Sequence, residues 1–91
     1  MTGEVPDAII AAILADAAQR TGVAVEAIEV VSAESVTWND GSLGCPEPGM
    51  LYTQALVDGS QVLLHADGEE LDYRVGPGGS FLLCENGRPA K

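Results

Sequence analysis

The fold of this chain is decided by residues 61–75, which read QVLLHADGEELDYRV. Two segments in which apolar and polar side chains alternate flank the pair Asp67-Gly68. Alternation places the apolar side chains of a strand on one face. An Asp-Gly pair between two such segments is among the strongest short-range signals for a two-residue hairpin turn. The stretch therefore predicts an antiparallel hairpin formed by residues 61–66 and 69–75.

The same pattern occurs one step earlier in the chain, where Asp58-Gly59 separates residues 50–57 from residues 61–66. If both pairs form two-residue loops, Val62 faces Ala55 and Tyr73. The apolar face would then contain Leu51, Ala55, Val62, Leu64, Leu71, Tyr73 and Val75. The opposite face would carry Tyr52, Gln54, Gln61, His65, Glu70, Asp72 and Arg74. A G1-bulge turn in either hairpin would shift the register by one residue.

The remaining segments complete an α+β fold. Apolar residues at helical spacing, with Pro6 before them and Gly22 after them, predict a helix over residues 6–21. Residues 28–38 are the first strand candidate and residues 80–84 the last, and the place of the first in the sheet order stays open. The polar residues Ser32 and Glu34 predict a bulge or bend within the first. We expect an N-terminal helix packed on a four- to five-stranded antiparallel meander. The expected domain spans residues 6–85, with residues 1–5 and 86–91 disordered.

The charge balance excludes several kinds of partner. The 91 residues contain 4 Lys and Arg against 14 Asp and Glu, for a net charge of −10. So few cations form no basic patch, which argues against nucleic acid and anionic membrane surfaces as partners. The apolar run at residues 8–15 is too short to span a bilayer, so we expect no membrane insertion. Acidic residues precede that run, so any signal for export is expected to be absent from this chain.

The chain has two cysteines, Cys45 and Cys84. One interpretation is a disulfide in an extracytoplasmic protein; the other is two unpaired thiols packed as small apolar residues in a cytosolic protein. Cys45 lies between Gly44 and Pro46, in a loop that is a poor place for a buried free thiol. This position favours the disulfide.

The loop that contains Cys45 is the candidate recognition site. Its prolines restrict φ and its glycines permit positive φ, so we expect it to have a definite shape. The candidate contact residues are Trp38, Asp40, Ser42, Leu43 and Glu47. An unknown protein is the expected partner, and a serine protease inhibitor that presents Leu43 is the alternative function. A purely structural loop, in which Trp38 and Leu43 cover the open end of the core, is a third interpretation.

Catalytic chemistry has little support in the sequence. In the predicted register Tyr52, His65 and Glu70 lie side by side on the outer face, a possible acid–base or metal site. An open sheet face offers no pocket, and a solvated face with polar cross-strand pairs is the simpler interpretation. One histidine and two distant cysteines do not match a zinc site. We therefore expect a protein that is not an enzyme and that has no cofactor or metal.

Residues 37–54, TWNDGSLGCPEPGMLYTQ, resemble a motif in small domains of bacterial secreted proteins and lipoproteins, especially actinobacterial ones. The core of the resemblance is the pattern WxDGSLGCPxPG, and similarity extends from about Ile28 to Cys84. The resemblance implies a location in the cell envelope or outside the cell, and with it the disulfide. It implies no activity and no catalytic residues.

Overall fold

The computed structural model describes residues 5–90 of the chain. The predicted helix is confirmed as α1, Asp7–Thr21. Asp7 stands in its first turn, where an acidic side chain suits the helix dipole. Gly22 ends it in the left-handed region at φ 78° and donates its backbone N–H to the Ala18 carbonyl oxygen at 2.8 Å. Glycine adopts this conformation without the steric cost that a Cβ imposes, so the helix ends where the sequence predicts.

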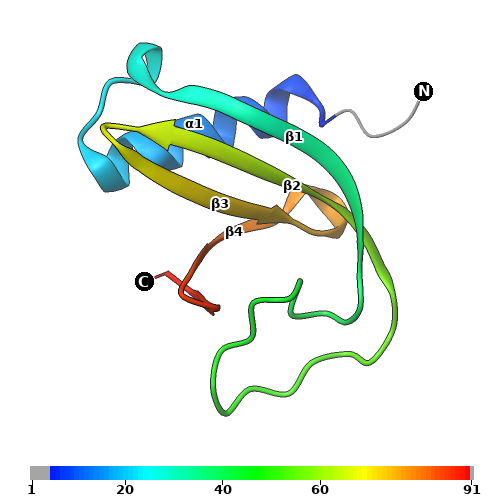
Figure 1. The fold of residues 1–91 in the computed structure, drawn as a ribbon. Coiled ribbons are helices and arrows are strands. Elements are labelled where there is room, and N and C mark those ends of the chain that lie inside the picture. Colours follow the sequence, from blue (N-terminus) through cyan, green and yellow to red (C-terminus); the bar gives the residue numbers. More distant parts are fainter. Residues whose placement is uncertain (1–4, 91) are drawn as a thin grey trace.

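Five antiparallel strands follow the helix and form one open sheet, confirming the α+β class (Figure 1). They are β1 (Glu29–Trp38), β2 (Val57–Ala66), β3 (Glu69–Val75), β4 (Phe81–Glu85) and β5 (Arg88–Pro89). Their order in the sheet equals their order in the chain. Two short 3₁₀ helices, η1 (Val25–Ala27) and η2 (Pro77–Gly79), precede β1 and β4.

The hairpin predicted from residues 61–75 is confirmed. Asp67 and Gly68 have φ values of 52° and 82°, as a two-residue turn with two positive φ angles requires. Val62 pairs with Tyr73, and Leu64 pairs with Leu71, as the alternation indicates. The predicted irregularity in the first strand is also present, as a register shift between Val30 and Ser32.

The predicted hairpin at Asp58-Gly59 is wrong. Both residues lie inside β2, where Asp58 pairs with Thr37 and Gly59 with Val36 of β1. Residues 50–56 are therefore not a strand, and β1 takes the place beside β2 that they were expected to occupy. Leu51 and Ala55 consequently leave the predicted apolar face, and both are exposed in the loop between β1 and β2.

Gly59 is required inside the strand for a steric reason. A Cβ on Gly59 would overlap the Val75 carbonyl oxygen and lie 2.8 Å from Nε1 of Trp38. The missing side chain thus makes room for the indole on the sheet face. Glycine in a strand often marks such a close approach rather than a turn, and alternation alone does not distinguish the two cases.

The C-terminal residues also differ from the expected disordered tail. Asn86 and Gly87 adopt φ values of 55° and 77° and connect β4 to β5. Cys84 pairs with Pro89, and Glu85 pairs with Arg88. Asn-Gly is a recognised hairpin signal, and it is the feature of the sequence that indicates this turn.

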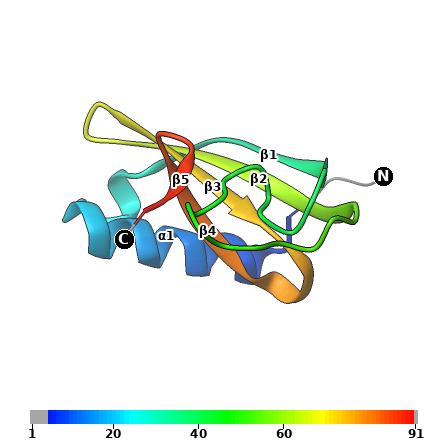
Figure 2. The ribbon, with the colours of Figure 1, turned by 90° about the horizontal axis from the view of Figure 1, so that it is seen from below.

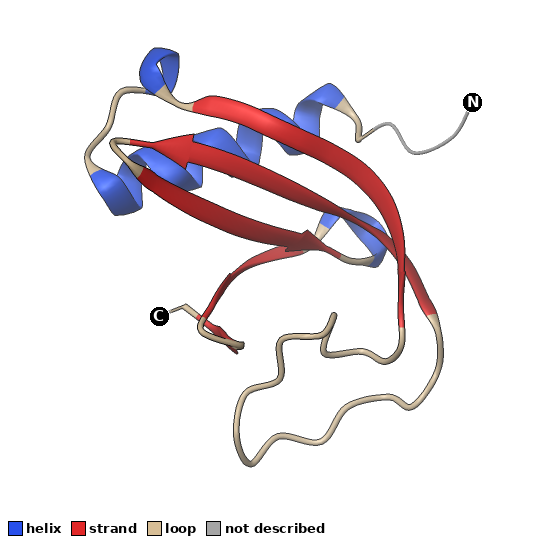
Figure 3. Cartoon of the chain, viewed as in Figure 1, coloured by secondary structure: helices blue, strands red, loops and turns tan. Residues whose placement is uncertain are grey.

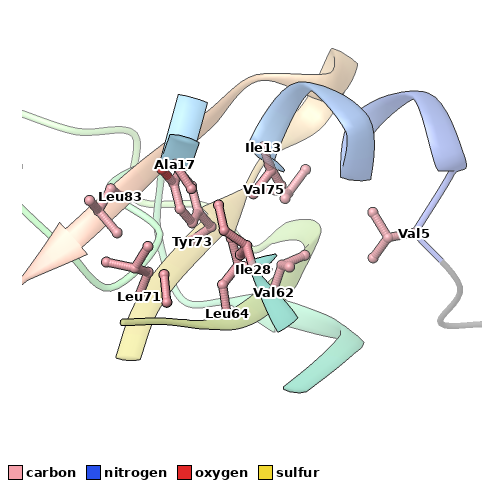
Figure 4. Packing of buried hydrophobic residues seen from close by; sticks show 11 residues of the cluster. Val5, Ile13, Ala17, Ile28, Val62, Leu64, Leu71, Tyr73, Val75 and Leu83 are labelled. Atoms are coloured by element: carbon pink, nitrogen blue, oxygen red, sulfur yellow. The ribbon is translucent and has the colours of Figure 1, made fainter. Parts of the chain in front are cut away.

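The helix packs along one side of the sheet, as Figure 2 shows, and the core lies between them (Figure 4). Ile13 and Ala17 of α1 are fully buried. They belong to one buried cluster with Val5, Ile28, Val62, Leu64, Ala66, Leu71, Tyr73, Val75 and Leu83. Val5 packs in this cluster although residues 1–5 were expected to be disordered; residues 1–4 lie outside the described part of the chain.

Candidate functional site

The longest segment without regular structure within residues 5–90 is the β1–β2 loop, residues 39–56, the long tan loop in Figure 3. It extends from one end of the sheet and returns beside the C-terminal hairpin (Figure 1). Glu47 and Pro48 of the loop line a hollow of about 260 Å³ together with Arg88 and Pro89 of β5. Loops of this length in compact domains are uncommon and are usually either functional or disordered.

A disulfide between Cys45 and Cys84 fastens the middle of this loop to β4. The two Cα atoms are 5.9 Å apart, within the usual range for a disulfide, and both residues are buried. Leu83 packs in the core beneath the helix. Because neighbouring side chains of a strand point to opposite faces, Cys84 points away from the helix. The loop is thus held against the face of the sheet that α1 does not cover.

Trp38 forms the base of the loop on that same face. Its side chain is 9% exposed, and its Nε1 donates a hydrogen bond to the Val75 carbonyl oxygen at 3.1 Å. The guanidinium carbon of Arg74 lies 5.2 Å from the centre of the indole ring, a cation–π distance. The last residue of β1 is therefore joined to β3 as well as to its neighbour β2.

Arg74 connects the sheet to the backbone of the loop. Its Nη1 donates a hydrogen bond to the Leu43 carbonyl oxygen at 3.0 Å. Its Nη2 and Nε donate hydrogen bonds to the two carboxylate oxygens of Asp72, at 2.8 and 3.3 Å. Gln61 of β2 also donates to Asp72, at 3.0 Å. This network orients the guanidinium, so Arg74 is a positioning residue for the loop.

The first turn of the loop is shaped by Asp40. Its Oδ1 accepts hydrogen bonds from the Ser42 backbone N–H at 2.9 Å and from the Ser42 hydroxyl at 2.5 Å. These two bonds favour the charged carboxylate and lower the pKa of Asp40 below its usual value. Such bonds are those of an Asx-type turn, in which the side chain caps its own backbone. The hydrogen bonds between Asp40 and Ser42 therefore stabilise the first turn of the loop.

Leu43 is buried beneath the loop. Its side chain is 6% exposed, and its methyl groups lie against Gly76 in the β3–β4 connection. Its backbone has φ 58°, in the left-handed region. A serine protease inhibitor needs an exposed side chain at the position that enters the specificity pocket. Leu43 in this conformation does not present one.

The structure brings most of the candidate residues together in residues 38–45, the part of the loop that is fastened to the sheet. We call this part the anchored base. Trp38, Ser42 and Leu43 are buried, while Asp40 and Glu47 are half-buried. The exposed apolar side chains of the loop are instead Met50, at 57%, Leu51, at 96%, and Leu56, at 73%. We call these three residues the apolar tip. Sequence reasoning missed them because the Asp58-Gly59 pattern had assigned residues 50–57 to a strand.

The polar row expected on the outer sheet face is only partly present. His65 pairs with Glu70, as predicted, and also with Glu29 of β1. Tyr52 is not beside them; it lies in the β1–β2 loop, where its hydroxyl accepts a hydrogen bond from the Glu47 backbone N–H at 3.0 Å. His65, Glu70 and Glu29 are all exposed.

A hollow of about 520 Å³ lies at the other end of the molecule, near the end of α1. The apolar surface of this hollow comes from Ala66, Leu71, Leu83 and Ala90. Its charged groups are those of Arg20, Asp67, Glu69 and Glu85. Nε of Arg20 donates to Asp16 at 2.6 Å, so this guanidinium is engaged by the helix itself. Within residues 5–90 no group of acidic, histidine or cysteine side chains is arranged to hold a metal ion. No helix in that range is long and apolar enough to cross a membrane.

Comparison with known proteins gives a family but no activity. A model of a protein family described as a domain of unknown function, DUF8738, matches residues 10–84. No curated protein and no solved structure matches the chain. The matched range begins in α1 and ends at the second cysteine of the disulfide, so it contains most of α1, the strands β1 to β3 and the β1–β2 loop. This chain therefore belongs to the DUF8738 family of domains of unknown function.

Proposed function

We propose that this domain is a non-enzymatic, extracytoplasmic binding module that contacts a protein partner through the apolar tip. The observation that carries the proposal is the contrast within one loop. Leu51 is 96% exposed, whereas Leu43, eight positions earlier, is 6% exposed. The loop buries one apolar side chain, Leu43, against the sheet, whereas the three side chains of the apolar tip remain exposed to solvent.

The base of the loop supports a role in recognition. A loop that is already ordered loses less conformational entropy when a partner binds, so more of the contact energy appears as affinity. The disulfide, the Trp38–Val75 hydrogen bond and the Arg74–Leu43 hydrogen bond restrain this loop before any partner arrives. Leucine and methionine side chains presented from such a base suit an apolar pocket on another protein.

The disulfide supports the extracytoplasmic location. Disulfides persist in oxidising compartments and are rare in the cytosol. Here the bond joins two buried cysteines and holds a loop that has no other covalent anchor. Other families of small exported domains use cross-links in the same way, because a small core leaves little margin of stability.

Site-specific photo-crosslinking in living cells tests the proposal. We would place a photoreactive amino acid at Leu51 and, as a matched control, at Val25, an exposed apolar residue of η1. Crosslinking is expected to give a discrete protein adduct from position 51 only, and Met50→Ser is expected to weaken it. Equal adducts from both positions, or none from position 51, would contradict a docking role for the tip.

A direct assay separates this function from protease inhibition. The oxidised protein would be incubated with subtilisin- and chymotrypsin-like proteases, and substrate turnover would be measured. We expect no inhibition, because the Leu43 side chain is buried and its carbonyl oxygen already accepts a hydrogen bond from Arg74. Tight inhibition that is lost in Leu43→Ala would replace the proposed function with the inhibitor function.

A further inference from the structure

A second surface of the molecule has unused hydrogen-bonding capacity. β1 is ten residues long and lies at the edge of the sheet, where it pairs only with β2 among the strands of residues 5–90. The other edge is β5, which has two residues. Every second residue of an edge strand directs its backbone N–H and C=O away from the sheet. β1 forms this edge of the sheet (Figure 1) and therefore offers a row of backbone donors and acceptors to a further strand.

The regular part of this row is residues 32–38. The register shift of β1 lies between Val30 and Ser32, and the pairing from Ser32 to Trp38 continues without interruption. Seven residues are a normal length for a strand. Ser32, Ala33 and Ser35 are small, so the first part of this run presents little side-chain bulk to an incoming backbone.

Several of the usual means of protecting an edge strand are missing from this run. Natural sheets block long edges with proline, inward-pointing charges, lysine side chains or a covering segment. Residues 32–38 contain neither proline nor lysine, and no element of the described chain pairs with their outer side. The bulge at Val31 stands before the run and leaves its regular geometry intact.

Charge decides which kind of strand fits. Glu29 and Glu34 are exposed on β1, and Asp58 is exposed on the neighbouring strand. The chain as a whole carries a net charge of −10. A second copy of β1 would bring its own acidic residues to this edge, and like charges across paired strands are destabilising. A cationic segment is instead stabilised by attraction to these acidic residues. The electrostatic field of the protein also steers such a segment toward it.

We propose that the β1 edge, residues 32–38, binds an extended basic segment of another protein as an added sixth strand. Backbone hydrogen bonds supply the ladder, and the acidic side chains of β1 select lysine or arginine in the partner. The exposed Val30 and Val31 provide apolar contact at the start of the run. This surface is separate from the apolar tip, and the proposal does not depend on the function of the tip.

The test uses the oxidised 91-residue protein and three blocked seven-residue peptides. In the first, lysine and valine alternate; the second has glutamate in place of each lysine; the third has proline in place of each valine. Amide hydrogen exchange and NMR shifts report the site of binding. The first peptide is expected to protect alternate amides between residues 32 and 38, which is the pattern of a strand ladder. The other two are expected to protect none.

Variants of the protein test the charge contribution. Glu34→Lys is expected to weaken binding of the lysine peptide by about two- to tenfold, since an exposed attractive pair becomes repulsive. Glu69→Lys makes the same change in net charge on β3, away from the edge, and is expected to have a smaller effect. Equal losses in both variants would show a general electrostatic attraction and would overturn the assignment to the edge.

The remaining outcomes also decide the question. If the peptide with proline in place of valine binds as well as the lysine–valine peptide, no strand ladder forms and the proposal fails. If the lysine peptide does not bind at all, the proposal fails equally. Protection of alternate β1 amides in the protein alone, rising with concentration together with a dimer mass, would replace the basic segment with a second copy of the chain. A failure of the crosslinking experiment at Leu51 would not change how peptide binding to β1 is interpreted.

Discussion

The indole of Trp38 lies against Gly59 on the neighbouring strand, so closely that a Cβ on Gly59 would be 2.8 Å from Nε1 of Trp38. The same nitrogen donates its hydrogen to the Val75 carbonyl oxygen of β3. The bare backbone of Gly59 therefore admits the aromatic side chain that closes the base of the β1–β2 loop. One small residue in β2 thereby determines where a large residue of β1 can lie.

Substituting Gly59 by alanine is expected to destabilise the domain. The added methyl group meets a backbone carbonyl oxygen and the indole, and neither can move without breaking the hydrogen bond between them. Overpacking of this kind costs about 1–3 kcal/mol. Chemical denaturation followed by circular dichroism measures the change, with Ser35→Ala on the exposed edge of β1 as control. Equal stability of Gly59→Ala and the control would show that Trp38 does not occupy this position.

Two leucines of the same loop are expected to respond differently to truncation. Leu43→Ala removes a buried side chain from its contact with Gly76 and should lower the free energy of unfolding by about 2–5 kcal/mol. Leu51→Ala removes a side chain that is 96% exposed and should change it by less than about 0.5 kcal/mol. Each variant is the control of the other in a denaturant titration. Similar losses in both would contradict the division between an anchored base and an exposed tip.

Reduction of the disulfide is expected to lower the melting temperature strongly. The bond closes a separation of 39 residues, and the chain-entropy relation assigns about 4 kcal/mol to a loop of this length. For a domain of this size such a loss corresponds to roughly 20 °C. Calorimetry with and without reductant measures it, and a Cys45→Ser and Cys84→Ser double variant should not respond to reductant. Coincident melting of the oxidised and reduced wild-type protein is the result that would exclude this contribution.

The stability of the helix–sheet contact is expected to depend on pH through Asp16. Burial disfavours its charged form, but hydrogen bonds from Tyr73 and Arg20 together outweigh burial, so the pKa of Asp16 lies below 3.8. A carboxyl whose folded pKa is lowered contributes stability above its unfolded pKa and loses it as pH falls through the folded value. Asp16→Asn should therefore cost about 1 kcal/mol at pH 7, and the cost should shrink below about pH 4.

The control for this experiment is Asp67→Asn, which removes one exposed carboxylate from the β2–β3 turn and makes the same change in net charge. Denaturant titrations between pH 2 and pH 7 provide the comparison. A constant difference between wild type and Asp16→Asn over this range would contradict the assigned role of the carboxylate.

Tyr73 is expected to make the domain sensitive to alkali. Burial raises the pKa of its hydroxyl well above 10, and the hydrogen bond to the neighbouring Asp16 carboxylate raises it further. The unfolded chain releases this proton at about pH 10, so stability present below that pH is lost as pH rises above it. Tyr73→Phe should be about 1.5–3 kcal/mol less stable at pH 7, because a hydrogen bond to a charged group is lost. The loss of stability above pH 10 should be smaller in this variant, as thermal melts at pH 7 and pH 11 would show.

Much of the architecture follows from local patterns in the sequence. The α1 helix, the Asp67-Gly68 hairpin, the pairing of Val62 with Tyr73 and the irregularity in β1 all agree with the prediction. Each depends on residues close together in the chain, whose backbone preferences and alternation act in the same direction. Asn86-Gly87 belongs to the same class of signal and marks the C-terminal hairpin.

The tertiary structure alone decided the role of Gly59 and, with it, the shape of the candidate site. Asp58-Gly59 matches the hairpin pattern as well as Asp67-Gly68 does, and its local sequence cannot show that Trp38, twenty-one positions away, needs the space of the missing side chain. The choice between a turn and a strand was made by packing across β1, β2 and β3. That packing exposes Met50 and Leu51 and buries Leu43, because burial depends on contacts between segments far apart in the sequence.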